Sequence, residues 1–169
     1  MNGWIYTLAG GVVSWASKKQ TCISHSTMEA KFIALVAASK EAEWMRDLLL
    51  DIQLWPSPML SIIMYCDSQA TLSKAYNSVY NGKSRHIHLR QNYVRQVIKN
   101  GTISVVYVKS CRNLAYPLTK PLTRDLVCVT TRDIGNNKSL VNRSYNDASF
   151  LKFFSFITPS LQEGRTVSE

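Results

Sequence analysis

The sequence is short of acidic residues, with 11 Asp and Glu against 20 Lys and Arg in 169 residues, which gives a formal net charge of +9. The shortage is greatest between residues 83 and 132, where Asp125 is the one acid among ten basic residues. A basic excess distributed this unevenly favours an anionic partner, most simply nucleic acid. A solvated basic surface without a ligand is the alternative, because net charge alone identifies no partner.

Closely spaced cysteines and long apolar runs are also lacking. The four cysteines form no C-x-x-C pair, which argues against a structural zinc site. The apolar stretch at residues 150–157 is far shorter than the roughly 18 residues that a membrane helix needs. The first residues have no basic stretch ahead of an apolar one, so we expect no secretory signal. We therefore expect an intracellular protein, cytoplasmic or nuclear, that is not secreted and has no membrane partner.

What remains is a globular composition, with 46% hydrophobic and 18% charged residues, enough for the core of one domain. The regular patterns stop near Gly135. Residues 136–169 are rich in Asn and Ser and show no sustained periodicity. The sequence therefore predicts a domain over residues 1–135 and a poorly ordered, dispensable tail over residues 136–169.

Apolar periodicity predicts alternating strands and helices. The expected strands are residues 4–8 and 12–16, joined as a hairpin, then 60–66 and 102–108, with a possible further strand at 21–24. The expected helices are a long one from Ser26 to Ile52, then 68–76 and 87–99, and a short one within 113–122. This order predicts an α/β fold, a mixed sheet flanked by helices.

Two carboxylates stand out by position. Asp67 follows the apolar run 60–66 and would lie at the carboxyl end of a buried strand, where α/β proteins gather ligands. It could instead cap the helix that begins at Ser68. Glu29 lies in the first turn of the long helix, and with Ser26 it has the form of a capping box. The sequence pattern alone leaves both the functional and the capping interpretation open for each acid.

Five segments in order carry a resemblance to a known family. They are residues 13–21 (VSWASKKQT), 26–35 (STMEAKFIAL), 65–70 (YCDSQA), 83–90 (KSRHIHLR) and 113–122 (NLAYPLTKPL). They are similar to the patterns VSWxSKKQ, STxEAEYxAL, CDNQSA, RxKHIDIRYHFIR and xQLADxLTKPL. Each match is weak alone, but the ordered set, spanning about residues 4–135, resembles the ribonuclease H domain of copia-type LTR-retrotransposon Pol polyproteins.

The resemblance implies a ribonuclease H-like sheet and four metal-binding acids. Glu29 and Asp67 match two of them as catalytic and metal-binding residues, while Tyr116 stands where the family has the acid of "LAD". A phenol with a pKa near 10 cannot replace a carboxylate as a metal ligand. The family's first strand, with its acid, would precede the hairpin, so the resemblance implies a sheet whose first strand is missing. Paired divalent ions need an acid cluster, so we expect weak or no binding of the implied Mg²⁺ or Mn²⁺.

The resemblance also implies contacts to an RNA–DNA hybrid. The candidates are Gln69, Lys83, Arg85, His86 and Arg90. Basic side chains there would supply salt-dependent affinity that depends little on base sequence. The alternative is that several of them form only a solvated helix face.

The expected function is that of a retrotransposon ribonuclease H-like domain, whose ancestral reaction is metal-dependent cleavage of the RNA strand of RNA–DNA hybrids during reverse transcription. With two of four acids matched, we expect that activity to be impaired or absent, so whether this chain is an enzyme stays open. The alternative is a non-catalytic nucleic-acid-binding remnant or an unstable pseudogene product.

Overall fold

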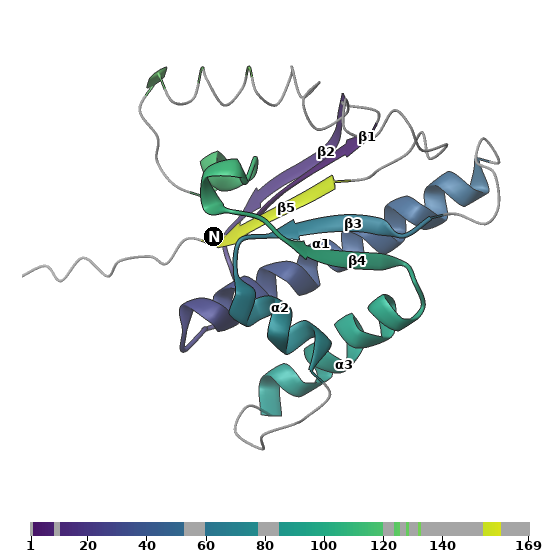
Figure 1. Cartoon of the computed structure of the whole chain (residues 1–169), viewed down its shortest axis with the longest axis vertical. Helices are drawn as coiled ribbons and strands as arrows, with labels where there is room; N and C mark the ends of the chain where they lie inside the picture. Colours follow the sequence, from purple (N-terminus) through teal and green to yellow (C-terminus); the bar gives the residue numbers. More distant parts are fainter. Residues whose placement is uncertain are drawn as a thin grey trace, which may run out of the picture.

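The computed structural model describes residues 2–8, 11–52, 60–77, 85–119, 124–125, 128, 132 and 154–159. These residues form a mixed five-stranded sheet with helices on one face (Figure 1). The strands are β1 (Asn2–Leu8), β2 (Gly11–Lys18), β3 (Ile62–Cys66), β4 (Ile103–Tyr107) and β5 (Phe154–Pro159). The helices are α1 (Thr27–Asp51), α2 (Gln69–Tyr76) and α3 (Arg85–Lys99), with 3₁₀ turns η1 (Ser110–Arg112) and η2 (Tyr116–Leu118).

The strand order is β2-β1-β5-β3-β4. β1 runs antiparallel to both of its neighbours, β2 and β5, whereas β3 runs parallel to both β4 and β5. The parallel pair β3–β4 is joined by α2 and α3, as parallel strands require a crossover connection. β5 is the link between the antiparallel and parallel halves, since β1 and β3 are not neighbours.

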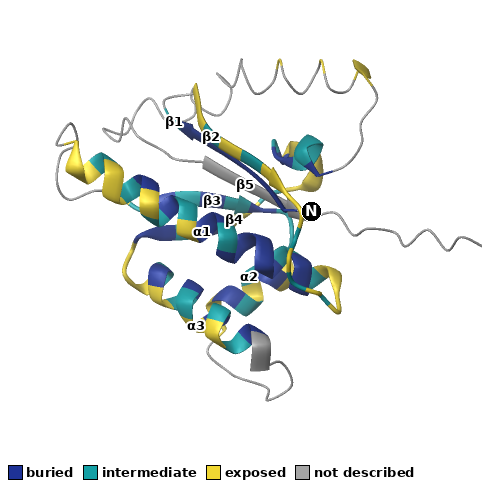
Figure 2. Cartoon of the chain, turned by 180° about the vertical axis from the view of Figure 1, so that it is seen from behind, coloured by how far each residue is buried: buried dark blue, intermediate teal, exposed yellow. Residues whose placement is uncertain are grey.

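The main core lies between the sheet and the three helices. Trp4 and Tyr6 of β1 and Met64 of β3 belong to one buried cluster with Phe32 and Leu35 of α1. Figure 2 shows dark blue, buried stretches along β1 and along α1. α3 contributes a row at helical spacing, Ile87, Val94 and Val97. Among the described helices, none combines the length and apolar character that a membrane crossing needs.

Most of the predicted elements are confirmed to within a few residues. The hairpin, the long helix, the two apolar strands and the helices at 68–76 and 87–99 are all present. Ser26 caps α1, its side chain accepting a hydrogen bond from the Glu29 N–H. Gly101 follows α3 with φ +70°, the left-handed conformation that favours glycine after a helix. The fold is thus mixed α/β, as expected.

Two predictions about local structure were wrong, and one strand was not predicted. Residues 21–22 form a bend and residues 23–24 have no regular structure, so the possible strand there is absent. The short helix expected within 113–122 is reduced to the 3₁₀ turn η2, where Pro117 interrupts the backbone ladder. The largest difference is β5, because residues 154–159 lie in the expected disordered tail. β5 lies between the hairpin strand β1 and the apolar strand β3. This is the position beside both elements that the missing first strand implied by the resemblance would have left open. The domain boundary at residue 135 stays a prediction.

The opposite face of the sheet is covered near β1 by η2. Ile5 is buried there against Ala115 and Leu118. The close approach depends on Gly3, since a Cβ at this position would lie 2.7 Å from Thr119 Cγ2 and 3.1 Å from Leu118 Cβ. η2 therefore rests directly on the backbone of β1.

We expect Gly3→Ala to lower the free energy of unfolding by about 1–3 kcal/mol, because the added methyl group overpacks this contact. Gly11→Ala is the matched control, since a Cβ there meets only Leu8 O at 3.6 Å, an ordinary contact. Denaturant titration of both variants measures the difference. Equal effects at the two glycines would show that η2 does not rest on β1 in solution.

Candidate functional site

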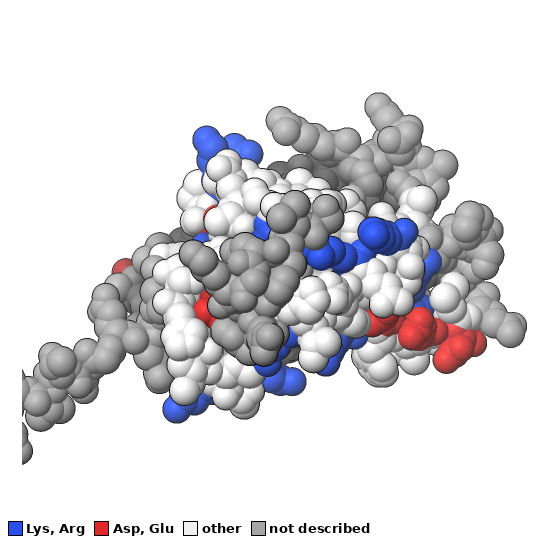
Figure 3. All heavy atoms as spheres, turned by 90° about the horizontal axis from the view of Figure 1, so that it is seen from below, with Lys and Arg blue, Asp and Glu red and all other residues white. Residues whose placement is uncertain are grey.

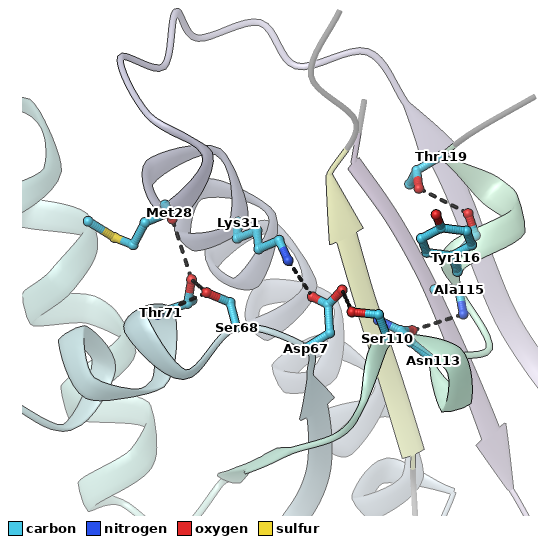
Figure 4. A network of polar contacts seen from close by, with 10 residues as sticks. All are labelled: Met28, Lys31, Asp67, Ser68, Thr71, Ser110, Asn113, Ala115, Tyr116 and Thr119. Atoms are coloured by element: carbon cyan, nitrogen blue, oxygen red, sulfur yellow. Dashed lines mark hydrogen bonds and ion pairs between the residues drawn. The ribbon is translucent and has the colours of Figure 1, made fainter.

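A polar network surrounds Asp67 at the carboxyl end of β3 (Figure 4). Asp67 Oδ1 accepts a hydrogen bond from Lys31 Nζ of α1 at 2.9 Å, and the two form an ion pair. Asp67 Oδ2 accepts one from Ser110 Oγ of η1 at 3.1 Å. The Asp67 side chain is 4% exposed and that of Lys31 is 17% exposed. Both carboxylate oxygens are therefore engaged by side chains from neighbouring elements.

The capping interpretation of Asp67 is wrong. The N-cap of α2 is Ser68, whose side chain accepts the Thr71 N–H. Thr71 Oγ1 in turn donates to Ser68 Oγ at 3.0 Å and to Met28 O of α1 at 3.4 Å. α2 is thereby tied to the start of α1, and Asp67 is left free to point toward Lys31 and Ser110.

The capping interpretation of Glu29 is confirmed. Its backbone N–H donates to Ser26 Oγ at 3.1 Å, and its carboxylate Oε2 accepts the His25 N–H at 2.9 Å. The residue is buried, with 5% of its surface exposed. Its carboxylate thus stabilises the start of α1, whether or not it has a further role.

The arrangement does not fit the divalent metal that the resemblance implies. Among the described residues there is no group of three or more His, Cys, Asp or Glu side chains that could hold a metal ion. Asp67 is paired with an ammonium group, and a cation bound there would be repelled by Lys31. Tyr116, in η2, brings a phenol and no carboxylate to this end of the sheet (Figure 4).

The buried thiol beside Asp67 adds no ligand or nucleophile. Burial raises the pKa of Cys66 to about 11, so the thiol stays protonated at neutral pH. The thiolate is the form that binds metals and attacks electrophiles. Cys66 is therefore a core residue, packed among the strands and α1.

Two basic residues lie within two positions of Ser110 in the chain. Lys109 and Arg112 are exposed and flank Ser110, the residue that binds Asp67. Sequence reasoning missed Lys31 and Ser110. For Lys31 the signal was present, since the family pattern STxEAEYxAL has glutamate at this position. The substitution reverses a charge directly beside Asp67.

The predicted nucleic-acid contacts do not form one cluster in the described residues. Gln69 is exposed at the start of α2. Arg90 Nη2 donates to Cys22 Sγ at 2.8 Å, so part of its guanidinium is used inside the protein. Arg85 and His86 lie in α3, but their side chains are outside the described set, as is Lys83 entirely. The face seen in Figure 3 carries blue Lys and Arg surface at several separate places.

The Lys31–Asp67 pair allows a test of stability. Lys31→Met should lower the free energy of unfolding by about 1–3 kcal/mol, because it removes a partner of a buried carboxylate. Adding Asp67→Asn should restore part of the loss, since no unpaired charge then remains. Lys19→Met, at an exposed position, is the control for losing one positive charge. A double-mutant cycle by thermal or chemical unfolding measures the coupling, and a coupling of zero would contradict the pair.

The chain is similar in sequence to the Pol polyproteins of several plant transposons. The chain is 32% identical over 123 residues to the retrovirus-related Pol polyprotein from transposon TNT 1-94 of Nicotiana tabacum, covering 73% of this chain and 9% of the relative. It is 35% identical over 136 residues to that from transposon RE2 of Arabidopsis thaliana, covering 79% and 9%. The match to transposon RE1 of the same plant is 34% over 125 residues, covering 73% and 8%. No protein-family model and no solved structure matches. These three relatives are Pol polyproteins of transposons, and the chain spans less than a tenth of the length of each.

Proposed function

We propose that the chain is a ribonuclease H-like domain of a transposon Pol polyprotein, and that it binds nucleic acid without cutting it. The relatives support a transposon-related function. The mixed sheet, with Asp67 at the end of a central strand and Glu29 at the start of a long helix, is compatible with that kind of domain. The finer assignment rests on the ordered sequence segments between residues 13 and 122.

The observation that carries the loss of cleavage is the 2.9 Å contact between Lys31 Nζ and Asp67 Oδ1. Two-metal hydrolysis needs a dense set of carboxylates to offset the repulsion between two divalent ions. Here an ammonium group neutralises the carboxylate at the end of β3, and Tyr116 stands at a position where the family has an acid. The local charge is suited to phosphate and not to divalent cations.

Binding would use cations at the same end of the sheet. Lys109 and Arg112 project from the exposed turn beside Ser110, within the segment that joins β4 to η2. Lysine and arginine contacts to phosphates release counterions, so each such contact steepens the dependence of affinity on salt. Because phosphates carry no base identity, we expect little preference for sequence.

The test is a pair of assays with an RNA–DNA hybrid. We expect no cleavage in Mg²⁺ or Mn²⁺, and binding that weakens by a factor of ten or more between 50 and 200 mM salt, on the order expected for a few phosphate contacts. Lys109→Gln with Arg112→Gln should reduce the affinity and the salt slope together. Lys40→Gln with Lys99→Gln, two exposed positions on the helices, is the control of equal charge.

Three outcomes would overturn the proposal. Hybrid cleavage that disappears in Asp67→Asn would show that the site is active. Affinity that is independent of salt would exclude phosphate contacts as its source. Equal losses in the two double variants would show that net charge alone governs binding.

A further inference from the structure

The most unusual feature of the fold is the origin of its central strand. β5 comes from residues 154–159, yet it lies inside the sheet with β1 on one side and β3 on the other (Figure 1). Asn2 to Thr7 pair with Pro159 to Phe154 in antiparallel register, and Ile63 to Cys66 pair with Phe154 to Ile157 in parallel register. Every other strand of the sheet comes from residues 2–107.

Without β5 the sheet would divide in two. β1–β2 and β3–β4 would each be a two-stranded ribbon, and such ribbons are marginally stable alone. The backbone groups of β1 and β3 that face β5 would lose their partners, and each buried one left unpaired is costly. The space between β1 and β3 is thus a slot that requires an extended segment of one defined direction.

Nothing in the described topology requires the strand to come from the same molecule. Residues 119–153 separate η2 from β5, and 35 residues can span roughly 115–125 Å when extended. That reach is several times the radius of gyration of about 15 Å expected for a compact chain of this length, so its length allows the strand to enter a second copy. Each copy carries one slot and one matching strand, so two copies are complementary to each other.

We propose that the slot between β1 and β3 is a strand-binding site, and that it accepts residues 154–159 from a second copy of this chain as well as from its own. The contact is β-strand addition, in which main-chain hydrogen bonds supply the affinity. The strand from the same chain competes at an effective concentration on the order of millimolar. The exchanged dimer therefore accumulates at comparable protein concentration, or when concentrated protein refolds. This inference does not depend on the proposed nucleic-acid binding.

The experiment uses the full chain with Phe156→Pro. Because β5 has a strand on each side, every backbone N–H in it faces a neighbour, and proline removes one of them. A synthetic peptide of residues 151–161 should bind this variant saturably and raise its Tm by roughly 5–10 °C at a hundredfold excess over Kd. The same peptide with Phe156→Pro, and one with scrambled order, are the controls. If the variant does not fold alone, it is refolded with each peptide and the recovered folded fraction is measured.

The unmodified chain tests directly whether two copies exchange residues 154–159. Refolded at millimolar concentration, it should yield a dimer by light scattering, which Phe156→Pro should not form and Phe156→Leu, which keeps the N–H, should form. A Phe156→Pro chain with an unchanged Tm would overturn the slot itself. Binding of the scrambled peptide would show an unspecific sheet edge, and the absence of a dimer would refute exchange between copies.

Discussion

A chain that ends at residue 153 should lose cooperative unfolding, although our sequence-based expectation was that the tail is dispensable. The deletion removes β5 and with it both ladders that join β1 to β3. With several backbone hydrogen bonds lost at about 1 kcal/mol each, and buried groups left unpaired, the loss should approach the 5–15 kcal/mol that stabilises a typical domain. Circular dichroism during heating, together with near-ultraviolet signals from the tryptophans, measures the change.

The matched control ends at residue 159, so that β5 is kept and only residues 160–169 are removed. We expect this shorter deletion to keep the unfolding transition of the full chain. If both deletions behave like the full chain, β5 contributes nothing to stability and the sheet closes in another way. If both lose the transition, residues 160–169 are needed as well.

A second large effect, a gain of metal binding, is expected when carboxylates are added near Asp67. Ile157 pairs with Cys66 at the end of the β5–β3 ladder, and the next residue of each segment, Thr158 and Asp67, follows at the same end of the sheet. We expect the combined change Lys31→Glu, Tyr116→Asp and Thr158→Asp to create binding of Mn²⁺ where the unmodified chain has little. The reason is the removal of the ammonium group from Asp67 and the addition of acids at this end of the sheet.

Metal binding to the triple variant should appear as a rise in the free energy of unfolding, about 1.4 kcal/mol for each tenfold excess of ion over Kd. Ligands of one ion act as a unit, so the single changes should each do little and the combination should exceed their sum. Adding Asp67→Asn should abolish the effect. A triple variant that folds and binds no ion, or one that binds equally with Asp67→Asn, would show that position 158 is not beside the site.

The elements that could be predicted from the sequence are those whose signals are local. The helical spacing of Phe32, Leu35 and Ala38 identifies the buried face of α1, and all three are buried. The capping pattern identifies the start of that helix, and Gly101 the end of α3. Asp67 follows its buried strand as expected.

What could not be predicted depends on contacts between distant segments. Residues 154–159 are too few to show a period, and their strand exists only because β1 and β3 leave a slot of matching length. The ion pair of Lys31 with Asp67 joins residues 36 positions apart, on elements that only the folded sheet brings together. The sequence indicated that Asp67 belongs to a polar site, but only the folded structure shows that Lys31 pairs with it.

The position of β5 also sets the order in which the protein can be completed during synthesis. Thr7 pairs with Phe154 and Asn2 with Pro159, so these contacts join residues 147 to 157 positions apart. Proteins dominated by such distant pairings have high contact order and fold slowly. A ribosome adding about 5–20 residues per second would have released the hairpin seconds before it released its partner strand. During that interval the edges of β1 and β3 that pair with β5 are unpaired. The other nascent chains on the same polysome are then the closest molecules that could supply a pairing strand.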